Sequence, residues 1–468
     1  MTGKRKRKLA MPDTLIIVAS VVLLVAILSW IIPSGTYDYQ EMNINGRIRN
    51  VAIDGTYHTI DKSEVTTTGF LGFFSVLYRG CVEAADVIFM ILCCCGTFGV
   101  VVKTGAFHAG IGTILKKLKG KEILLVPIIM MIFGLGGSVF GMASEFYGFY
   151  PLIVGLGVAL GYDAMFGFAI IAVGEFVGFM GATLNPYSVG IAQTISGVEL
   201  YSGTGYRAIC FVIFMAISII YVMVYGRKIK KNPGASVVFG EKNIHAFDRD
   251  ELNEYSFTLN DGLVLLDVLV VLVVLMLGLI KWGWDFPQLC GLFLLMSMIA
   301  AAICKWSPNK WCSEFIDSAK TAMWGCILTG IAKAITVVMQ DAQIMDTVIY
   351  GLSNVLKNAP HAVSAQVMLV VQTLINFFIP SATGQASATM PIMAQLADII
   401  GVSRQTAVLA FQFGDGLSNI FWPTADIVII CGLGGISLQK WYKWFTPLFL
   451  ILFVTQAILL GIATGIGF

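Results

Sequence analysis

Long apolar segments limit most strongly how this chain can fold. Residues 14–32 form one run without a charged side chain, and similar apolar runs lie within 208–225, 289–304 and 447–468. About 18–20 apolar residues in a helix cross a bilayer. Only helices and closed barrels satisfy their backbone groups in lipid, and barrel strands alternate apolar and polar residues. With 57% hydrophobic and only 12% charged residues among 468, the chain is predicted to be an all-α polytopic membrane protein.

The distribution of charge predicts the orientation. The basic run at 4–8 precedes the first span, and basic residues favour the cytoplasmic side. We therefore expect a multi-pass protein of the inner (cytoplasmic) membrane with a cytoplasmic N-terminus. No small-residue cleavage site follows the first apolar run, which argues against a signal peptide. The ten Cys lack metal-ligand spacing and none of the four His lies in mid-span, so no metal, no cofactor and no nucleic-acid partner is expected.

Changes in composition divide the chain into five parts. A polar stretch separates two apolar halves, and each half contains a segment too short and too amphipathic to span, followed by a broken apolar run. The predicted parts are 1–81, the first span and an outer loop; 82–226, a first repeat with a hairpin at 122–160; 227–260, a cytoplasmic linker; 261–310, two scaffold spans; and 311–468, a second repeat with a hairpin at 361–401.

The two halves resemble each other in order. "VVKTGA" (101–106) matches "VVMQDA" (337–342), and Gly141-x-x-Ser144 matches Gly384-x-x-Ser387. Further along, Pro151 matches Pro391, Gly174-Glu175 matches Gly414-Asp415, and the "NP" at 185–186 matches the "WP" at 422–423. An odd number of predicted spans separates the halves, so they are expected to have opposite orientation. Inverted repeats with broken helices at matching positions are typical of secondary transporters.

Two polar stretches interrupt the apolar sequence at these matching positions. "GLGGSVFGMASE" (134–145) and "PSATGQASATMP" (380–391) are rich in Gly, Ser and Thr. Irregular backbone at membrane depth is tolerated where it lines a cavity, and small residues let the backbone approach a ligand. We predict that the stretches are the tips of two re-entrant hairpins, the first entering from inside and the second from outside.

At these residues the chain resembles a known family. "TLNPYSVGIAQTISG" (183–197), "FFIPSATGQASATMPIMAQLAD" (377–398) and "VSRQTAVLAFQFGDGLSNIFWPT" (402–424) are similar to the YfcC-like branch of the C4-dicarboxylate anaerobic carrier family, in the ion transporter superfamily. The resemblance covers nearly the whole chain. It implies an elevator-type carrier, a homodimer, and a mobile transport domain with both hairpins on a fixed scaffold. Members of this branch are described as basic amino acid antiporters of arginine/ornithine type. The chain departs from the branch at Glu175 and at Asp426.

Acidic residues dominate the predicted core of the carrier. No Lys or Arg occurs within 122–206, 358–403 or 405–439, and one base, Lys333, lies in the span before the second amphipathic segment. An unpaired charge in the membrane is costly, and intramembrane ionisable residues are functional by default. Four acids against one base favour a cationic substrate; the acids are Glu145, Glu175, Asp415 and Asp426.

The candidate site residues follow from these positions. Glu145 is expected to pair with the positive group of the substrate, with Asp415 as its counterpart. A substrate carboxylate would suit a half-helix N-terminus near one of the tips. The substrate-binding candidates are Ser144, Glu145, Asn185, Ser387, Thr389, Asp415 and Asn419. The candidates for ion or proton coupling are Ser138, Glu175, Thr383 and Ser418.

Structural alternatives stay open for these residues. Glu175 could instead form an ion pair with Lys333, and Asp426 could lie in solvent near the cytoplasmic end. The Ser and Thr hydroxyls could be packing residues, which helix contacts in membranes favour. Asn185 and Asn419 could only cap half-helices.

We expect a secondary active transporter whose partners are a small-molecule substrate, a coupling Na⁺ or H⁺, and the lipid bilayer. The substrate is predicted to be a basic amino acid; the alternative is a sodium- or proton-coupled C4-dicarboxylate carrier of the same fold. A membrane-embedded enzyme is disfavoured because the sequence has no HExxH motif and no His in mid-span. A passive channel is disfavoured because no rings of pore-lining charge are evident.

Overall fold

The computed structural model is built almost entirely of helices. Among the residues that it describes, seven helices are long and apolar enough to cross a membrane, which makes the protein a multi-pass membrane protein. The basic run at 4–8 and part of the predicted linker, residues 242–244 and 246–256, lie outside the described part of the chain. That part comprises residues 13–44, 47–118, 122–241, 245, 257–357 and 363–468.

The first half of the chain contains one early span, a small β region and a series of long and short helices. Its elements are α1 (Thr14–Ile31), β1 (Ser34–Thr36), β2 (Tyr39–Ile44), β3 (Arg47–Ala52), β4 (His58–Ile60), α2 (Phe70–Glu83), α3 (Ala85–Lys103), α4 (Ala106–Leu118), α5 (Leu125–Leu135), α6 (Phe149–Ala159), α7 (Ala164–Met180), α8 (Val189–Ile195) and α9 (Thr204–Lys231).

The described residues of the second half form helices and the loops that join them, with no strand among them. Its elements are α11 (Leu259–Lys281), α12 (Phe286–Ile303), α13 (Pro308–Lys320), α14 (Met323–Asp341), α15 (Met345–Lys357), α16 (Ser364–Phe378), α17 (Ala382–Ile399), α18 (Arg404–Ser418), α19 (Asp426–Gly434) and α20 (Leu438–Ile466).

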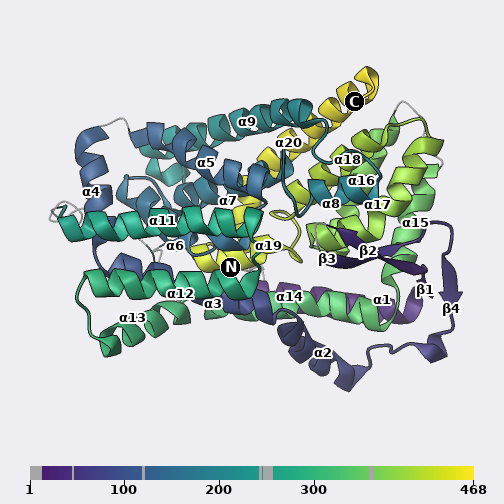
Figure 1. Ribbon diagram of the computed structural model, residues 1–468, viewed down its shortest axis with the longest axis horizontal. Coiled ribbons are helices and arrows are strands. Elements are labelled where there is room, and N and C mark those ends of the chain that lie inside the picture. Colours follow the sequence, from purple (N-terminus) through teal and green to yellow (C-terminus); the bar gives the residue numbers. More distant parts are fainter. Residues whose placement is uncertain (1–12, 45–46, 119–121, 242–244, 246–256, 358–362) are drawn as a thin grey trace, which may run out of the picture.

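The order of elements recurs between the halves. Helices α3 and α14 both have 19 residues, and the short helices that follow them, α4 and α15, both have 13. The packing recurs as well: α3 packs against α12 and α13, as α14 packs against α1 and α2, while α5 packs on α7 as α16 packs on α18. Figure 1 shows α4 at the left end of the molecule and α15 at the right end, with the long helices between them.

The polar segment after α1 contains two pairs of short β-strands. β1 pairs antiparallel with β4, and β2 pairs antiparallel with β3. The amphipathic helix α2 completes this region and packs against α14. The sequence-based expectation of an all-α chain with an outer loop after the first span did not include these strands, because each is short.

The second polar stretch is not the irregular tip that its composition predicts. The helical path is interrupted only between Phe378 and Ala382, and α17 is helical from Ala382 onward, including Pro391. Polar side chains are accommodated in this helix because their hydroxyls bond to its own carbonyl groups. Ser387 donates to the carbonyl of Thr383 (2.9 Å), and Thr389 donates to that of Gln385 (2.8 Å).

The first polar stretch is an interruption, as predicted. A single π-helical turn, Gly136–Phe140, follows α5, and a short 3₁₀ turn, Ser144–Phe146, precedes α6. Glycines bring this segment against α7. A Cβ atom on Gly178 would lie 2.2 Å from the carbonyl oxygen of Gly134, and one on Gly137 would lie 2.5 Å from that of Glu175. Close backbone contact therefore holds the first interruption on α7.

Replacing Gly178 with Ala should destabilise the protein because the added methyl group meets backbone that cannot move aside. We expect the free energy of unfolding to fall by about 1–3 kcal/mol, seen as a lower melting temperature of the detergent-solubilised protein. Gly205→Ala on α9 is the matched control, since a Cβ atom there meets nothing within 4 Å. Equal melting temperatures for the two variants would contradict the close contact.

Candidate functional site

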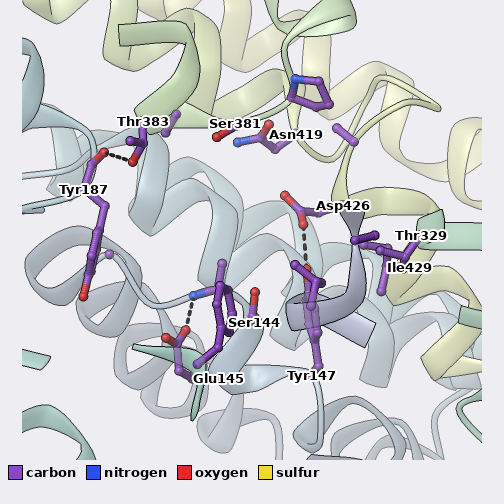
Figure 2. A pocket seen from close by; sticks show the side chains of 18 of the residues that line it. Ser144, Glu145, Tyr147, Tyr187, Thr329, Ser381, Thr383, Asn419, Asp426 and Ile429 are labelled. Carbon is purple, nitrogen blue, oxygen red and sulfur yellow. Dashed lines mark hydrogen bonds between the residues drawn. The ribbon is translucent and has the colours of Figure 1, made fainter. Parts of the chain in front are cut away.

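A cavity of about 420 Å³ lies where the interrupted helices of the two halves meet. Figure 2 shows Ser144 and Glu145 on one side of it and Ser381, Thr383 and Asn419 on the opposite side. The remaining wall comes from the ends of α2 and α11, the start of α12 and the middle of α14. Segments far apart in the sequence therefore enclose one chamber.

The first interruption presents its backbone and one acid to the cavity. Gly141 has φ +69°, and a Cβ atom there would lie 2.3 Å from the side-chain oxygen of Asn185, so only glycine fits. Beyond it, Glu145 is 8% exposed, and one of its carboxylate oxygens accepts a hydrogen bond from the backbone N–H of Ala143 (2.9 Å). This bond fixes the carboxylate at the turn.

The second interruption presents a helix N-terminus. Ser381 caps α17, and its hydroxyl accepts a hydrogen bond from the N–H of Gly384 (3.3 Å). Residues 380–383 line the cavity, so the partial positive charge of the first turn of α17 faces it. The Thr383 hydroxyl donates to the carbonyl of Tyr187 (2.9 Å), which connects this turn to the broken span of the first half.

The break between α18 and α19 adds a further acid. Asp426 opens α19 and lines the cavity. Its carboxylate accepts a hydrogen bond from the hydroxyl of Tyr147, 2.6 Å away (Figure 2), so Asp426 does not lie in bulk solvent at a cytoplasmic end. A carboxylate is also favourable in the first turn of a helix.

Acidic side chains outnumber basic ones on the cavity wall. The ionisable carboxyl and ammonium groups there are four acids and one base: Glu83, Glu145, Asp285, Asp426 and Lys333. Two of the acids, Glu145 and Asp426, come from the interrupted segments, whereas Glu83 and Asp285 come from the ends of neighbouring helices. The chamber is suited to a ligand that carries positive charge.

The structure separates the predicted site residues into two groups. Ser144, Glu145, Thr383 and Asn419 line the cavity. The others bond to the protein behind its wall: Ser138 donates to the carbonyl of Gly181 (3.0 Å), Ser418 donates to that of Gly414 (2.5 Å), and Asn185 accepts from the N–H of Tyr187 (2.9 Å). Those that do not line the cavity are Ser138, Glu175, Asn185, Ser387, Thr389, Asp415 and Ser418.

Glu175 is not paired with Lys333. It is fully buried on α7, and the Tyr150 hydroxyl donates to one of its oxygens (2.9 Å). The second oxygen has no hydrogen-bond partner among the described residues. Lys333 instead lines the cavity, which rules out the structural ion pair as the explanation for Glu175.

Asp415 belongs to a buried polar cluster between α16, α17 and α18. The amide nitrogen of Asn376 lies 2.9 Å from an Asp415 oxygen, 3.1 Å from the side-chain oxygen of Asn419 and 3.2 Å from that of Gln385. An amide has only two N–H hydrogens for these three acceptors. The other Asp415 oxygen and the Asn376 oxygen have no hydrogen-bond partner in the described part of the chain. The cluster therefore holds more acceptors than donors.

Sequence reasoning missed several of these residues. Tyr147, Asp285 and Glu83 carry no local signal because they lie in different segments and meet only in the fold. Asn376 and Gln372 had a usable signal: two amide side chains four positions apart in the apolar run "LVVQTLINFFI" share one helix face. That spacing predicts a polar stripe on α16 facing a polar partner.

Replacing Asn376 with Ala should leave buried carboxylate and amide oxygens without a donor. We expect a loss of about 1–3 kcal/mol in the free energy of unfolding, measured by thermal melting. Thr373→Val, on the same helix, is the control because the Thr373 hydroxyl bonds only to the carbonyl of Leu369 in its own helix (2.8 Å). If both variants melt together, Asn376 is not the donor on which the cluster depends.

Comparison with known proteins agrees with this architecture. The family model described as "C4-dicarboxylate anaerobic carrier" matches residues 11–465. A protein of Escherichia coli K12 named "Putative basic amino acid antiporter YfcC" is 32% identical, over 100% of this chain and 99% of the relative. An uncharacterized protein of Haemophilus influenzae Rd is 27% identical over 99% of both chains.

Two solved structures also match over nearly the whole length of the chain. The YdaH transporter of Alcanivorax borkumensis has a TM-score of 0.44 and 15% identity, with 98% of this chain and 99% of that chain covered. MtrF of Neisseria gonorrhoeae, described with a class of antimetabolite efflux pumps, has a TM-score of 0.44 and 16% identity, with 97% and 96% covered. On the full-length family match and the similarity to YfcC, this chain belongs to the C4-dicarboxylate anaerobic carrier family, in its YfcC-like branch.

Proposed function

We propose that this protein is a secondary carrier that exchanges basic amino acids of arginine/ornithine type across the cytoplasmic membrane. The observation that carries the proposal is the cavity wall, where four acids face one lysine. A guanidinium or ammonium group would be paired there, whereas an anionic ligand would meet like charge. The name of the E. coli relative supports the same substrate class.

An amino acid substrate fits the two ends of the cavity differently. Its cationic side chain would lie toward Glu145 and Asp426. Its α-carboxylate would lie at the N-terminus of α17, near Ser381 and Thr383, where backbone N–H groups and the helix dipole favour an anion. Both ends of a basic amino acid would thus be complemented by one chamber.

We further propose an elevator mechanism. The pairs α5–α6 and α16–α17 would be re-entrant hairpins of a mobile unit that carries the cavity against a scaffold containing α1, α3, α12 and α14. The recurrence of elements, and the position of α4 and α15 at opposite ends in Figure 1, support two halves of opposite orientation. The resemblance to the family also favours a homodimer, and the basic run at 4–8 favours a cytoplasmic N-terminus.

The acceptor-rich cluster around Asp415 is the candidate site for a coupling cation. A proton or a sodium ion would supply the positive charge that its oxygens lack, and carboxylate and amide oxygens are suitable ligands for a hard cation. Glu175 is a second carboxyl group that could carry a proton, since it is fully buried and Tyr150 is its one hydrogen-bond partner in the described chain. No enzymatic role is proposed.

Arginine exchange tests the proposal. Proteoliposomes loaded with ornithine should accumulate labelled arginine, and Glu145→Gln should reduce the uptake rate on the order of tenfold or more, because a hydrogen bond to a charged group contributes about 1.5–3 kcal/mol. Asp317→Asn is the control, since that acid lies on α13 in an exposed pair with Lys320. Uptake of succinate without uptake of arginine would refute the basic amino acid assignment.

Sodium binding tests the coupling site separately. If the cluster binds Na⁺, sodium chloride should raise the melting temperature of the wild type relative to choline chloride, because a ligand stabilises the state that binds it. Asp415→Asn should abolish that difference, while Asp317→Asn should retain it. A sodium effect that persists in Asp415→Asn would place the ion elsewhere. No sodium effect in the wild type, together with arginine exchange driven by a pH gradient, would favour a proton.

A C4-dicarboxylate carrier is the second candidate. Lys333 and the N-terminus of α17 both line the cavity, and these two positive features could hold the two ends of a dicarboxylate with sodium balancing the nearby acids. Lys333→Gln distinguishes the candidates. It should abolish succinate transport if this second function is correct, and it should preserve arginine exchange if the first is correct.

A further inference from the structure

The β region after α1 has no role in the cavity, yet it is bound firmly to the rest of the protein. We name residues 34–44 and 47–60, with strands β1–β4, the β cap. The Ser34 hydroxyl donates to the carbonyl of Ala342 (2.7 Å), and the N–H of Gly35 donates to the carbonyl of Gln343 (2.8 Å). These bonds fix β1 at the junction between α14 and α15.

The β cap is also anchored along α15. The Asp346 carboxylate accepts hydrogen bonds from the N–H of Tyr37 (3.0 Å) and the hydroxyl of Tyr39 (2.8 Å). The ring of Tyr57 stacks on that of Tyr350, with centroids 4.1 Å apart. Burial and the negative charge of Asp346 raise the pKa of Tyr39, so its phenol remains a protonated donor even above the pH at which tyrosine ordinarily ionises. The β cap and α15 therefore form one unit.

The other side of the β cap rests on α17. Strand β3 packs on this helix, and Val51 and Ala52 of β3 are buried. Beside this small apolar contact lies a cavity of about 500 Å³, lined by apolar residues and by polar side chains from both sides, including Gln40 of the cap and Gln395 of α17. A permanent core is packed without such gaps, whereas surfaces that separate are more polar. We infer that the contact between the β cap and α17 can separate.

Helix α17 connects this contact to the substrate cavity. Its first turn, at Ala382 and Thr383, lines that cavity. Pro391, in the middle of the helix, and Gln395, toward its C-terminus, line the cavity beside the cap. The helix is unbroken over its 18 residues, although Pro391 within it has no backbone N–H to donate. One continuous helix therefore joins the substrate cavity to the contact with the cap.

We propose that the β cap is a latch on the second hairpin: held by α15, it fixes α17 in the present state and must part from α17 when the carrier changes state. This inference rests on the proposed carrier function, since it needs a hairpin that moves. It assigns a conformational role to a β region that the transport cycle does not otherwise require.

Distance measurement tests the latch without knowledge of the substrate. The background is Cys312→Ser, which removes the one exposed cysteine of the ten. Spin labels are attached to two double variants. The first, the α17 pair, is Gln40→Cys with Gln395→Cys, and the second, the α15 pair, is Gln40→Cys with Gly351→Cys. Gly351 is on α15, and a Cβ atom there meets nothing within 4 Å. Pulsed electron paramagnetic resonance in lipid nanodiscs should give two distance populations for the α17 pair and one for the α15 pair. One narrow population in both pairs, or two in both, would overturn the proposal.

Cross-linking of the same pairs gives a functional test. A flexible thiol-reactive cross-linker that dithiothreitol cleaves should lower arginine exchange at least tenfold in the α17 pair and less than twofold in the α15 pair, with recovery after cleavage. Full exchange by the cross-linked α17 pair would refute the latch while leaving the carrier function intact. If the protein moves no substrate even before cross-linking, the proposed carrier function is refuted. The distance populations then still decide whether the cap parts from α17.

Discussion

Polar backbone at membrane depth must find its hydrogen bonds inside the protein, and this requirement shapes the whole molecule. The first interruption exists because Gly134, Gly137 and Gly178 allow it to lie directly on α7. The second is shorter, because Ser381 caps the helix that follows it. Where the two meet, the remaining polar groups line a chamber instead of facing lipid. The cavity is thus a consequence of how the backbone groups at the helix breaks find their hydrogen bonds.

The buried carboxylates also need hydrogen-bond partners inside the protein. Carboxylates that line the chamber accept hydrogen bonds from nearby donors. Glu145 accepts one from the backbone N–H of Ala143, and Asp426 accepts one from the hydroxyl of Tyr147. Such donors hold a carboxylate in place without neutralising it, so its charge stays available to a ligand. Behind the wall, acceptors around Asp415 outnumber the donors that Asn376 provides. We read the first arrangement as a site for a cationic substrate and the second as a site for its coupling ion.

Much of the fold follows from sequence periodicity and composition. The spans, the matching interruptions and the family were predictable, because apolar length and ordered repetition are local properties of a chain. The expectation of an irregular backbone throughout 380–391 was wrong, because α17 is helical from Ala382 onward. Ser and Thr favour loops in water, but their hydroxyls bond to the helix itself when the helix is packed. Of the candidate site residues, Ser144, Glu145, Thr383 and Asn419 lie on the cavity wall, because each lies at or beside a break.

The sequence alone determined that this protein crosses a membrane, that its halves repeat, and that acids outnumber bases where its helices break. Those properties depend on side-chain type and order. Only the tertiary structure decided which polar residues face the chamber. It turned Asp415 and Glu175 toward buried partners, brought Asp426 and Lys333 to the wall, and set the β cap on α17. The physical reason is that helix rotation and packing between distant segments select which face of each helix meets the cavity, and no local pattern encodes that choice.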